Sequence, residues 1–467
     1  FLESLGVSRV LWQELLPESM REKEKAFSLN FFSLRQNLSR PGLSQEEKEK
    51  LRLELARQEE AYLVFLSQMR YLSPELAQIF SPQQVTLEWA QENLTGSDTA
   101  VVEYFIGEKK SLLICLTRDD GHFFALPGRD EIKDSLRGYL KLLSSPPSDD
   151  FLGELASKRL YRELLGRAEK VFPPNIKRLI IVPDDVLFFL PFETLSSPFS
   201  SEKEEFLTSR YSVSYSPSVS SLALLNTREK KSYPVHFLGL GNPSYSGQKI
   251  SLFSRRVSSA EILMDVYQSQ GFSLSPLPGS EREVKKISRL FPESKSKIFL
   301  RENAREEVLK QEDIRQAQVI HFACHGFLDL NFPFRSALVL SQLSSSREDG
   351  FFQVREVYTC PIEAEMVVLS ACQTGKGTLE RGEGLVGLPR VFFISGARSV
   401  VSTLWNIEDR PAADFMLSFY TNLYRGMNKA EALGKTKQEM LRSKKYSHPH
   451  YWGAFVLNGD ALSTIEF

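Results

Sequence analysis

The spacing of apolar and polar residues divides the chain into a helical start and a longer region of mixed strands and helices. Segment 44–69 is rich in Glu, Lys, Leu, Ala and Gln, and its apolar residues recur at helical spacing, at Leu51, Leu55, Tyr62, Phe65 and Met69. Arg40-Pro41-Gly42 separates this helix from the helical run before it. We therefore expect residues 1–94 to form an α-helical hairpin region, the end of a truncated N-terminal repeat region.

From about residue 95, short apolar runs alternate with amphipathic stretches. The runs expected to be strands are 99–106, 110–117, 122–126, 178–183, 235–241, 319–326, 336–341, 365–375 and 397–405. Helical patterns fall near 281–291, 384–395, 411–426 and 428–443. This alternation predicts an α/β fold with a mostly parallel sheet flanked by helices. Segment 227–234 is the predicted linker between two α/β halves, 95–230 and 231–467.

Composition narrows the class of protein without naming a function. The formal net charge of the 467 residues is −1, so we expect no nucleic-acid partner. The four cysteines are scattered, as in reduced intracellular proteins, and no apolar run reaches the roughly 20 residues of a membrane helix. The chain begins without Met and without a signal-peptide pattern. We interpret it as a cytoplasmic piece of a longer protein.

The stretch VIHFACHG, residues 319–326, places two histidines and a cysteine within five positions. If it is one regular strand, His321 and His325 share a face and Cys324 points to the other, which argues against a three-ligand metal cluster. A metal-dependent hydrolase remains an alternative, but we expect no metal and no cofactor. His321 is interpreted as a core histidine and Cys324 as apolar filler. His325, next to Gly326 at the predicted strand end, is the functional candidate.

A second predicted strand ends in Ser370-Ala371-Cys372, followed by a glycine-rich loop. A thiol at a strand end is a nucleophile candidate, because a nearby imidazole can take its proton. His325 precedes Cys372 by about the 50 residues that separate the catalytic pair of caspases. We expect His325 as general base and Cys372 as nucleophile, with the backbone N–H groups of Gly326 and Cys372 as oxyanion hole.

These motifs resemble the CHAT family, caspase-like peptidases that are often fused to tetratricopeptide repeats. The resemblance rests on HFACHG at 321–326, VVLSACQTG at 367–375, RGEGLVGLPR at 381–390, GARSVVSTLW at 396–405 and YWGAFVLNG at 451–459. It implies a caspase-like fold with a degenerate first half and a catalytic second half. It also implies a cysteine endopeptidase that cleaves a specific protein, is regulated by its N-terminal region or by a partner, and acts in bacterial defence or stress signalling. A catalytically silent peptide-binding signalling scaffold is the alternative.

Two acidic residues are candidates for substrate binding. Asp409 follows a predicted strand, and Glu383 lies in the glycine-rich loop, so either carboxylate could attract a basic P1 side chain. Separases, which resemble the segment 404–409, cut after arginine. The alternative is that Asp409 or Glu383 caps a helix N-terminus. His448 and His450 look like metal ligands, but a surface or core role is favoured.

Overall fold

The structure, a computed structural model, describes part of the chain. It covers residues 85–467 except 147–150, 199–205, 227–230, 246–273, 328–335, 344–347, 361 and 371–387, together with scattered positions from 22 to 65. The chain divides into two compact units, Phe1–Gln84 and Val85–Phe467.

In the first unit, nearly all the described residues are helical, as predicted. The ring centroids of Phe27 and Phe65 lie 5.6 Å apart, so the two helical runs of the expected hairpin are in contact. Leu51 is described and helical. Leu55, Tyr62, Met69 and the break at 40–42 lie outside the described residues.

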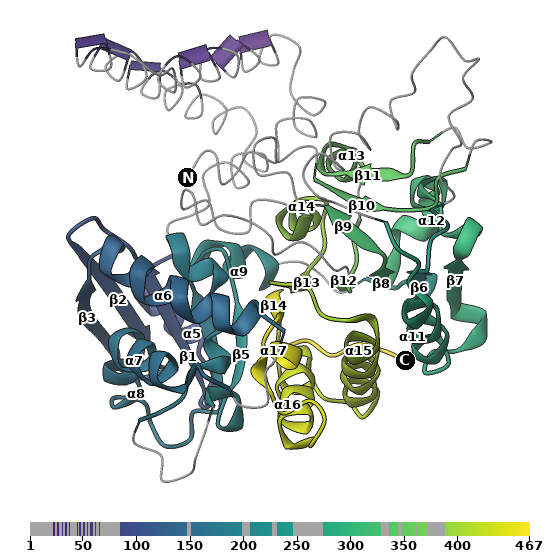
Figure 1. Cartoon of the computed structure of the whole chain (residues 1–467). Helices are drawn as coiled ribbons and strands as arrows, with labels where there is room; N and C mark the ends of the chain where they lie inside the picture. The colour runs from purple at the N-terminus through teal and green to yellow at the C-terminus, as the bar shows by residue number, and fades with distance from the viewer. Residues whose placement is uncertain are drawn as a thin grey trace. The chain divides into compact units, whose positions relative to one another are not determined.

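The second unit is built on one large sheet (Figure 1). Among the described residues this sheet has 11 strands in the order β3-β2-β1-β4-β5-β14-β13-β12-β8-β6-β7. Their bounds are β1 Thr99–Phe105, β2 Lys110–Leu116, β3 Gly121–Pro127, β4 Arg178–Val182, β5 Ser212–Tyr215, β6 Val235–Gly241, β7 Ser296–Leu300, β8 Ala317–Ala323, β12 Met366–Leu369, β13 Ser399–Thr403 and β14 Phe455–Gly459.

Within this sheet most neighbouring strands are parallel, and the antiparallel pairs among its described residues are β1–β2, β2–β3 and β13–β14. The predicted mostly parallel sheet is therefore confirmed. β14 pairs with both β13 and β5, so the sheet runs without interruption from the first predicted half into the second. The domain boundaries at 94 and 230 stay predictions.

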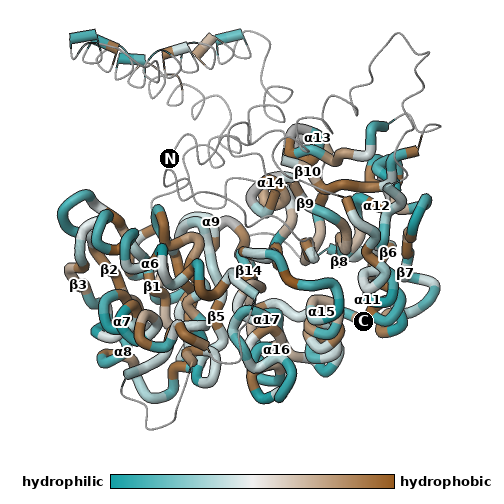
Figure 2. Tube along the Cα trace, in the orientation of Figure 1, coloured by the Kyte–Doolittle hydropathy of each residue, from teal (hydrophilic) through white to brown (hydrophobic). Residues whose placement is uncertain are grey.

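Helices cover both faces of this sheet. Their bounds are α5 Leu87–Leu94, α6 Arg129–Ser144, α7 Glu154–Leu164, α8 Gly166–Glu169, α9 Val219–Asn226, α11 Pro278–Ser288, α12 Glu312–Arg315, α13 Val354–Thr359, α14 Leu388–Ile394, α15 Asp409–Tyr424, α16 Lys429–Arg442 and α17 Pro449–Trp452. α6, α7, α11, α15 and α16 share one large apolar core with the sheet, while α5 and α9 pack on the opposite face. Figure 2 shows hydrophobic residues concentrated along the strands. None of the described helices is both long and apolar enough to span a bilayer.

The predicted strand 319–326 is wrong in one respect. β8 ends at Ala323, Cys324 forms a bend, and His325–Phe327 forms β9 in a separate sheet with β10 (Ala337–Val339) and β11 (Phe351–Gln353). β9 pairs antiparallel with β10, which draws the chain out of the large sheet. Face alternation therefore does not carry across Cys324, and Gly326 lies within a strand instead of ending one.

The family segment 451–459 is divided between a helix and a strand. The apolar run 451–457 belongs partly to helix α17, which has Pro449 at its first position, and only Phe455 onward joins β14. Proline at a first helical position is compatible with helix formation because its missing N–H would have no partner there.

A buried ion pair links the middle of the chain to its C-terminal helices. Glu193 Oε1 lies 2.6 Å from Lys437 Nζ of α16, and both side chains are almost fully buried. The Tyr215 hydroxyl of β5 donates to the second Glu193 oxygen. Burial lowers the pKa of Lys437, whereas the Glu193 carboxylate raises it. Each charge thus compensates the other and offsets the desolvation cost of burying it in the apolar core.

Removing one partner of this pair should destabilise the fold. Glu193→Ala leaves the Lys437 ammonium buried alone, and we expect a loss of about 3–5 kcal/mol in the free energy of unfolding. Chemical denaturation monitored by circular dichroism measures it. The control is Glu163→Ala, which breaks the exposed pair with Arg159 and should cost less than about 1 kcal/mol. Equal effects of the two variants would contradict this role of the buried pair.

Candidate functional site

The candidate residues follow, in the sequence, the carboxyl ends of three neighbouring parallel strands. β8 pairs with β12 through Val368↔His321 and Leu369↔Phe322, and β12 pairs with β13 through Val368↔Val401. Because these strands are parallel, their carboxyl ends lie at the same edge, where α/β proteins place functional groups. His325 follows the end of β8, and Asp409 follows that of β13.

His325 is enclosed by two segments that lie far from it in the sequence. The residue is only 4% exposed. Nε2 lies 2.8 Å from the carbonyl oxygen of Ser275 and 3.3 Å from the Ser275 backbone nitrogen. The ring packs beside Tyr245 with centroids 5.3 Å apart, and the His325 backbone N–H donates to the Tyr245 hydroxyl at 3.4 Å.

These contacts favour one tautomer and a neutral ring. A carbonyl oxygen only accepts hydrogen bonds, so the shorter contact to Ser275 favours a proton on Nε2 and leaves the basic lone pair on Nδ1. Burial lowers the pKa of His325 from its ordinary value of 6.5, while the bond to Ser275 and the carboxylate of Asp409 act in the opposite direction. A neutral imidazole is the form that a general base requires.

The Ser275 carbonyl is placed by the start of helix α11. Asn242, just after β6, accepts from the Leu277 N–H at 3.1 Å through its side-chain oxygen. Its own backbone N–H donates to the Ser280 hydroxyl at 2.8 Å. At Gly241, a Cβ would lie 2.9 Å from a methyl of Val284, so glycine allows α11 to pack closely on β6. The contact between His325 and Ser275 was not predicted, because the residues near Ser275 and Asn242 form no recognisable motif.

Asp409 is the first residue of α15, and its carboxylate points at α11. Its Oδ2 accepts the Gly279 N–H at 2.5 Å, and a Cβ on Gly279 would lie 2.2 Å from the same carboxylate. The helix predicted at 411–426 is α15, and it starts at Asp409. The Asp409 carboxylate accepts a hydrogen bond from the first turn of α11. A carboxylate is favourable at a helix N-terminus because of the helix dipole. Its influence on the His325 pKa also places it within electrostatic range of the imidazole.

His321 is a core residue, as expected. Its Nε2 lies 2.8 Å from Glu283 Oε1 of α11, and its Nδ1 lies 3.1 Å from the Tyr420 hydroxyl of α15. All three side chains are buried. Both ring nitrogens are thus engaged within the core, and the metal-dependent hydrolase at 319–326 gains no support from the geometry.

Of the other residues that the sequence singled out, some are described by the structure and some are not. Cys372 and Glu383 lie outside the described residues. Gly326 stands opposite Leu338 in the β9–β10 pair, and the oxyanion role of its N–H stays a prediction. Cys324 is buried. The His450 ring is buried, with Nδ1 2.9 Å from the Leu143 carbonyl oxygen, which agrees with the favoured core role.

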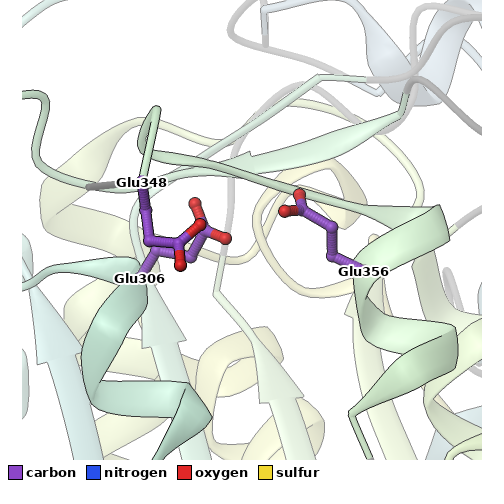
Figure 3. Close-up of side chains that lie close together, drawn as sticks. All are labelled: Glu306, Glu348 and Glu356. Carbon is purple, nitrogen blue, oxygen red and sulfur yellow. The ribbon is translucent and has the colours of Figure 1, made fainter.

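One acidic cluster was not anticipated. Glu306, Glu348 and Glu356 bring their carboxylates within 4.8 Å of one another (Figure 3). Lys310 Nζ lies 2.8 Å from Glu306 and 2.6 Å from Glu348, so a lysine provides a cation within the cluster. Burial raises the pKa of Glu306 to about 8. With this internal cation present, we assign the cluster no metal-binding role.

The electrostatic setting of His325 can be tested without substrate. We expect NMR titration of labelled histidine to give His325 a pKa below 6.5, with Nε2 protonated in the neutral ring. Asp409→Asn keeps an oxygen for Gly279 but removes the negative charge, so the His325 pKa should fall further. Glu408→Gln, one residue away, is the control and should leave it unchanged. A rise in Asp409→Asn would contradict this account.

Comparison with known proteins identifies the family. The chain is 24% identical over 319 residues to tetratricopeptide repeat protein 28 of Mus musculus and over 320 residues to that of Homo sapiens; each match covers 61% of this chain and 12% of the relative. Among solved structures, the separase-securin complex of Saccharomyces cerevisiae has a TM-score of 0.44 at 13% identity, covering 79% of this chain and 31% of that one. The Arg specific cysteine proteinase gingipain R has a TM-score of 0.41 at 7% identity, covering 72% and 76%. The CHAT domain model matches residues 154–460, about two thirds of the sequence, and the chain therefore belongs to the CHAT domain family.

Proposed function

We propose that this chain is a cysteine endopeptidase in which His325 is the general base and Cys372 the nucleophile. The observation that carries the proposal is the pairing of β8 with β12. His325 lies two residues beyond the end of β8, and Cys372 lies three residues beyond the end of β12 in the sequence. Because β8 and β12 are adjacent and parallel, their described ends Ala323 and Leu369 lie at the same sheet edge, which supports the pairing of His325 with Cys372.

The surroundings of His325 support the role of base. Its imidazole is buried and its pKa is lowered, so the ring is neutral at neutral pH and can accept a proton. The Ser275 carbonyl favours the tautomer with the lone pair on Nδ1. A second hydrogen-bonding partner that orients the base is the arrangement typical of activated nucleophiles.

The proposed reaction proceeds in two stages. The Cys372 thiol gives its proton to His325, and the thiolate sulfur attacks the peptide carbonyl carbon, whose oxygen gains the electron pair and is stabilised by backbone N–H groups of Gly326 and Cys372. The C–N bond then breaks, and the leaving amine takes the proton from His325. Water, activated by the neutral imidazole, hydrolyses the thioester and regenerates the thiol.

Substrate choice forms a further part of the proposal. The Asp409 carboxylate acts to raise the pKa of His325, and we infer that it also attracts a basic P1 side chain of the substrate. Its bond to Gly279 uses one carboxylate oxygen, Oδ2. Glu383 remains a second candidate on sequence grounds. Because the chain spans 12% of the curated relatives, regulation by an N-terminal repeat region or a partner, and a role in defence, are also proposals.

Removing the nucleophile should abolish cleavage. We expect Cys372→Ala to reduce proteolysis by at least about a thousandfold, because the covalent route is lost. The measurement is incubation with proteins encoded beside this one, followed by mass spectrometry of the cut ends. Cys360→Ala is the control, since Cys360 is buried with its thiol donating to the Leu309 carbonyl. Cleavage by Cys372→Ala at the wild-type rate would sink the proposal that Cys372 is the nucleophile, and absence of cleavage by the wild-type chain would favour a peptide-binding scaffold.

The role of Asp409 in specificity can be separated from its bond to Gly279. In Asp409→Asn we expect kcat/KM for substrates with P1 Arg or Lys to fall about tenfold or more relative to neutral P1 residues, since a hydrogen bond to a charged group contributes about 1.5–3 kcal/mol. A peptide library read by mass spectrometry measures the preference. Glu408→Gln serves as the neighbouring control. If all substrates slow equally, Asp409 positions the site and does not read P1.

A further inference from the structure

One end of the large sheet carries a cluster of exposed apolar side chains. Phe105 of β1, Leu112 of β2 and Phe123 of β3 are 47%, 38% and 59% exposed, and Leu87 at the start of α5 is 39% exposed. The strand register puts Phe105 opposite Leu112 and Ile114 opposite Phe123, so all of them project from the same face. We call this set, with Ile114 and Ala125, the β1–β3 patch.

The opposite face of these strands is fully covered. There Tyr104, Leu113 and Leu126 belong to the large core, together with side chains of α6, α7 and α8. On the patch side, α5 and α9 cover only the part formed by Val101, Leu116 and β4. Sheets in α/β proteins pack helices on both faces, but among the described residues the layer formed by α5 and α9 does not extend over the patch residues of β2 and β3.

A carboxylate borders the patch on its β4 side. Glu103 of β1 stands between Ile114 of β2 and Val182 of β4. Burial raises its pKa to about 7, and the other charge acting on it comes from Asp184, a second acid. Among the described residues, no cation compensates Glu103. An apolar surface bordered by a partly buried, uncompensated carboxylate is complementary to an apolar surface that carries one basic group.

The local geometry favours a helix over a strand as the occupant. β3 is the edge strand, but Arg167 of α8 already donates to the Ala125 carbonyl, and Pro127 has no N–H to offer. Addition of a strand at this edge is therefore disfavoured. A two-fold axis beside Glu103 would bring two carboxylates together, so a second copy of the chain would not supply the missing cation there.

We propose that the β1–β3 patch docks an amphipathic helix of a partner protein whose apolar face carries a Lys or Arg opposite Glu103. The helix would lie beside α5 and complete the second layer over β2 and β3. This interaction is independent of the peptidase proposal, because the patch lies at the end of the sheet opposite β8 and β12 in strand order.

The test uses the full chain and synthetic helical peptides of about 14 residues, roughly four turns. Each peptide has a Leu/Ala apolar stripe with either Lys or Glu at its centre, and fluorescence anisotropy measures the Kd. We expect the Lys peptide to bind at least about tenfold more tightly than the Glu peptide, a difference of ~1.4 kcal/mol. Glu103→Lys should reverse this preference, and Phe123→Asp should weaken binding of the Lys peptide at least tenfold.

The matched control is Leu155→Asp, which changes an exposed leucine on α7 outside the patch and should leave binding unchanged. Circular dichroism melts confirm that each variant is folded. The proposal is overturned if neither peptide binds, if both bind equally, or if Phe123→Asp and Leu155→Asp behave alike. It is also overturned if sedimentation shows a dimer that Phe123→Asp dissociates, because a second copy would then occupy the patch.

Discussion

The hydrogen bond between His321 and Glu283 is the interaction on which the candidate-site end of the sheet depends. It joins β8 to α11 at 2.8 Å inside an apolar core, and Tyr420 of α15 completes it on the other ring nitrogen. Removing one partner of a buried polar pair leaves the other without compensation, at a cost of about 3–5 kcal/mol for charged groups. The strand and both helices are therefore held as one body.

Each group of the candidate site is attached to one of these three elements. His325 follows β8, Ser275 precedes α11, and Asp409 is the first residue of α15. The hydrogen bonds from His325 to the Ser275 carbonyl and from the Gly279 N–H to Asp409 then close the arrangement at the sheet edge. The buried hydrogen bonds of His321 thus fix the positions of the candidate-site residues at the carboxyl ends of the strands. This explains why His321 is structural, whereas His325 of the same motif is the candidate base.

The two ends of the sheet differ in how they are covered. At the β8–β12 end, helices pack on both faces. α11 and α15 contact the face of His321. On the other face, Phe392 of α14 packs against Phe322, with ring centroids 5.6 Å apart. At the β3 end, one face keeps exposed phenylalanines beside Glu103. Where helices cover the sheet, the buried carboxylate of Glu193 is paired with Lys437. Where the helical layer is incomplete, the carboxylate of Glu103 has no compensating cation among the described residues.

The sequence by itself determined the class of the fold and the identity of the chemical groups. Buried parallel strands read as continuous apolar runs, so β4, β6 and β12 could be located, and the family motifs could be recognised because His325-Gly326 and Ala371-Cys372-Gln373 are local in the chain. Short strands such as β5 and β7 were missed, because their sequences SVSY and SKIFL carry too weak a pattern.

Only the tertiary structure decided where the strand 319–326 breaks and what surrounds His325. The bend at Cys324 depends on the pairing of β9 with β10, and the tautomer of His325 depends on a carbonyl 50 residues earlier in the chain. The same holds for Asp409, whose partner Gly279 is 130 residues away. A hydrogen bond between segments so distant leaves no periodicity in the sequence, because it is set by how the helices pack on the sheet and not by the local conformation of either segment.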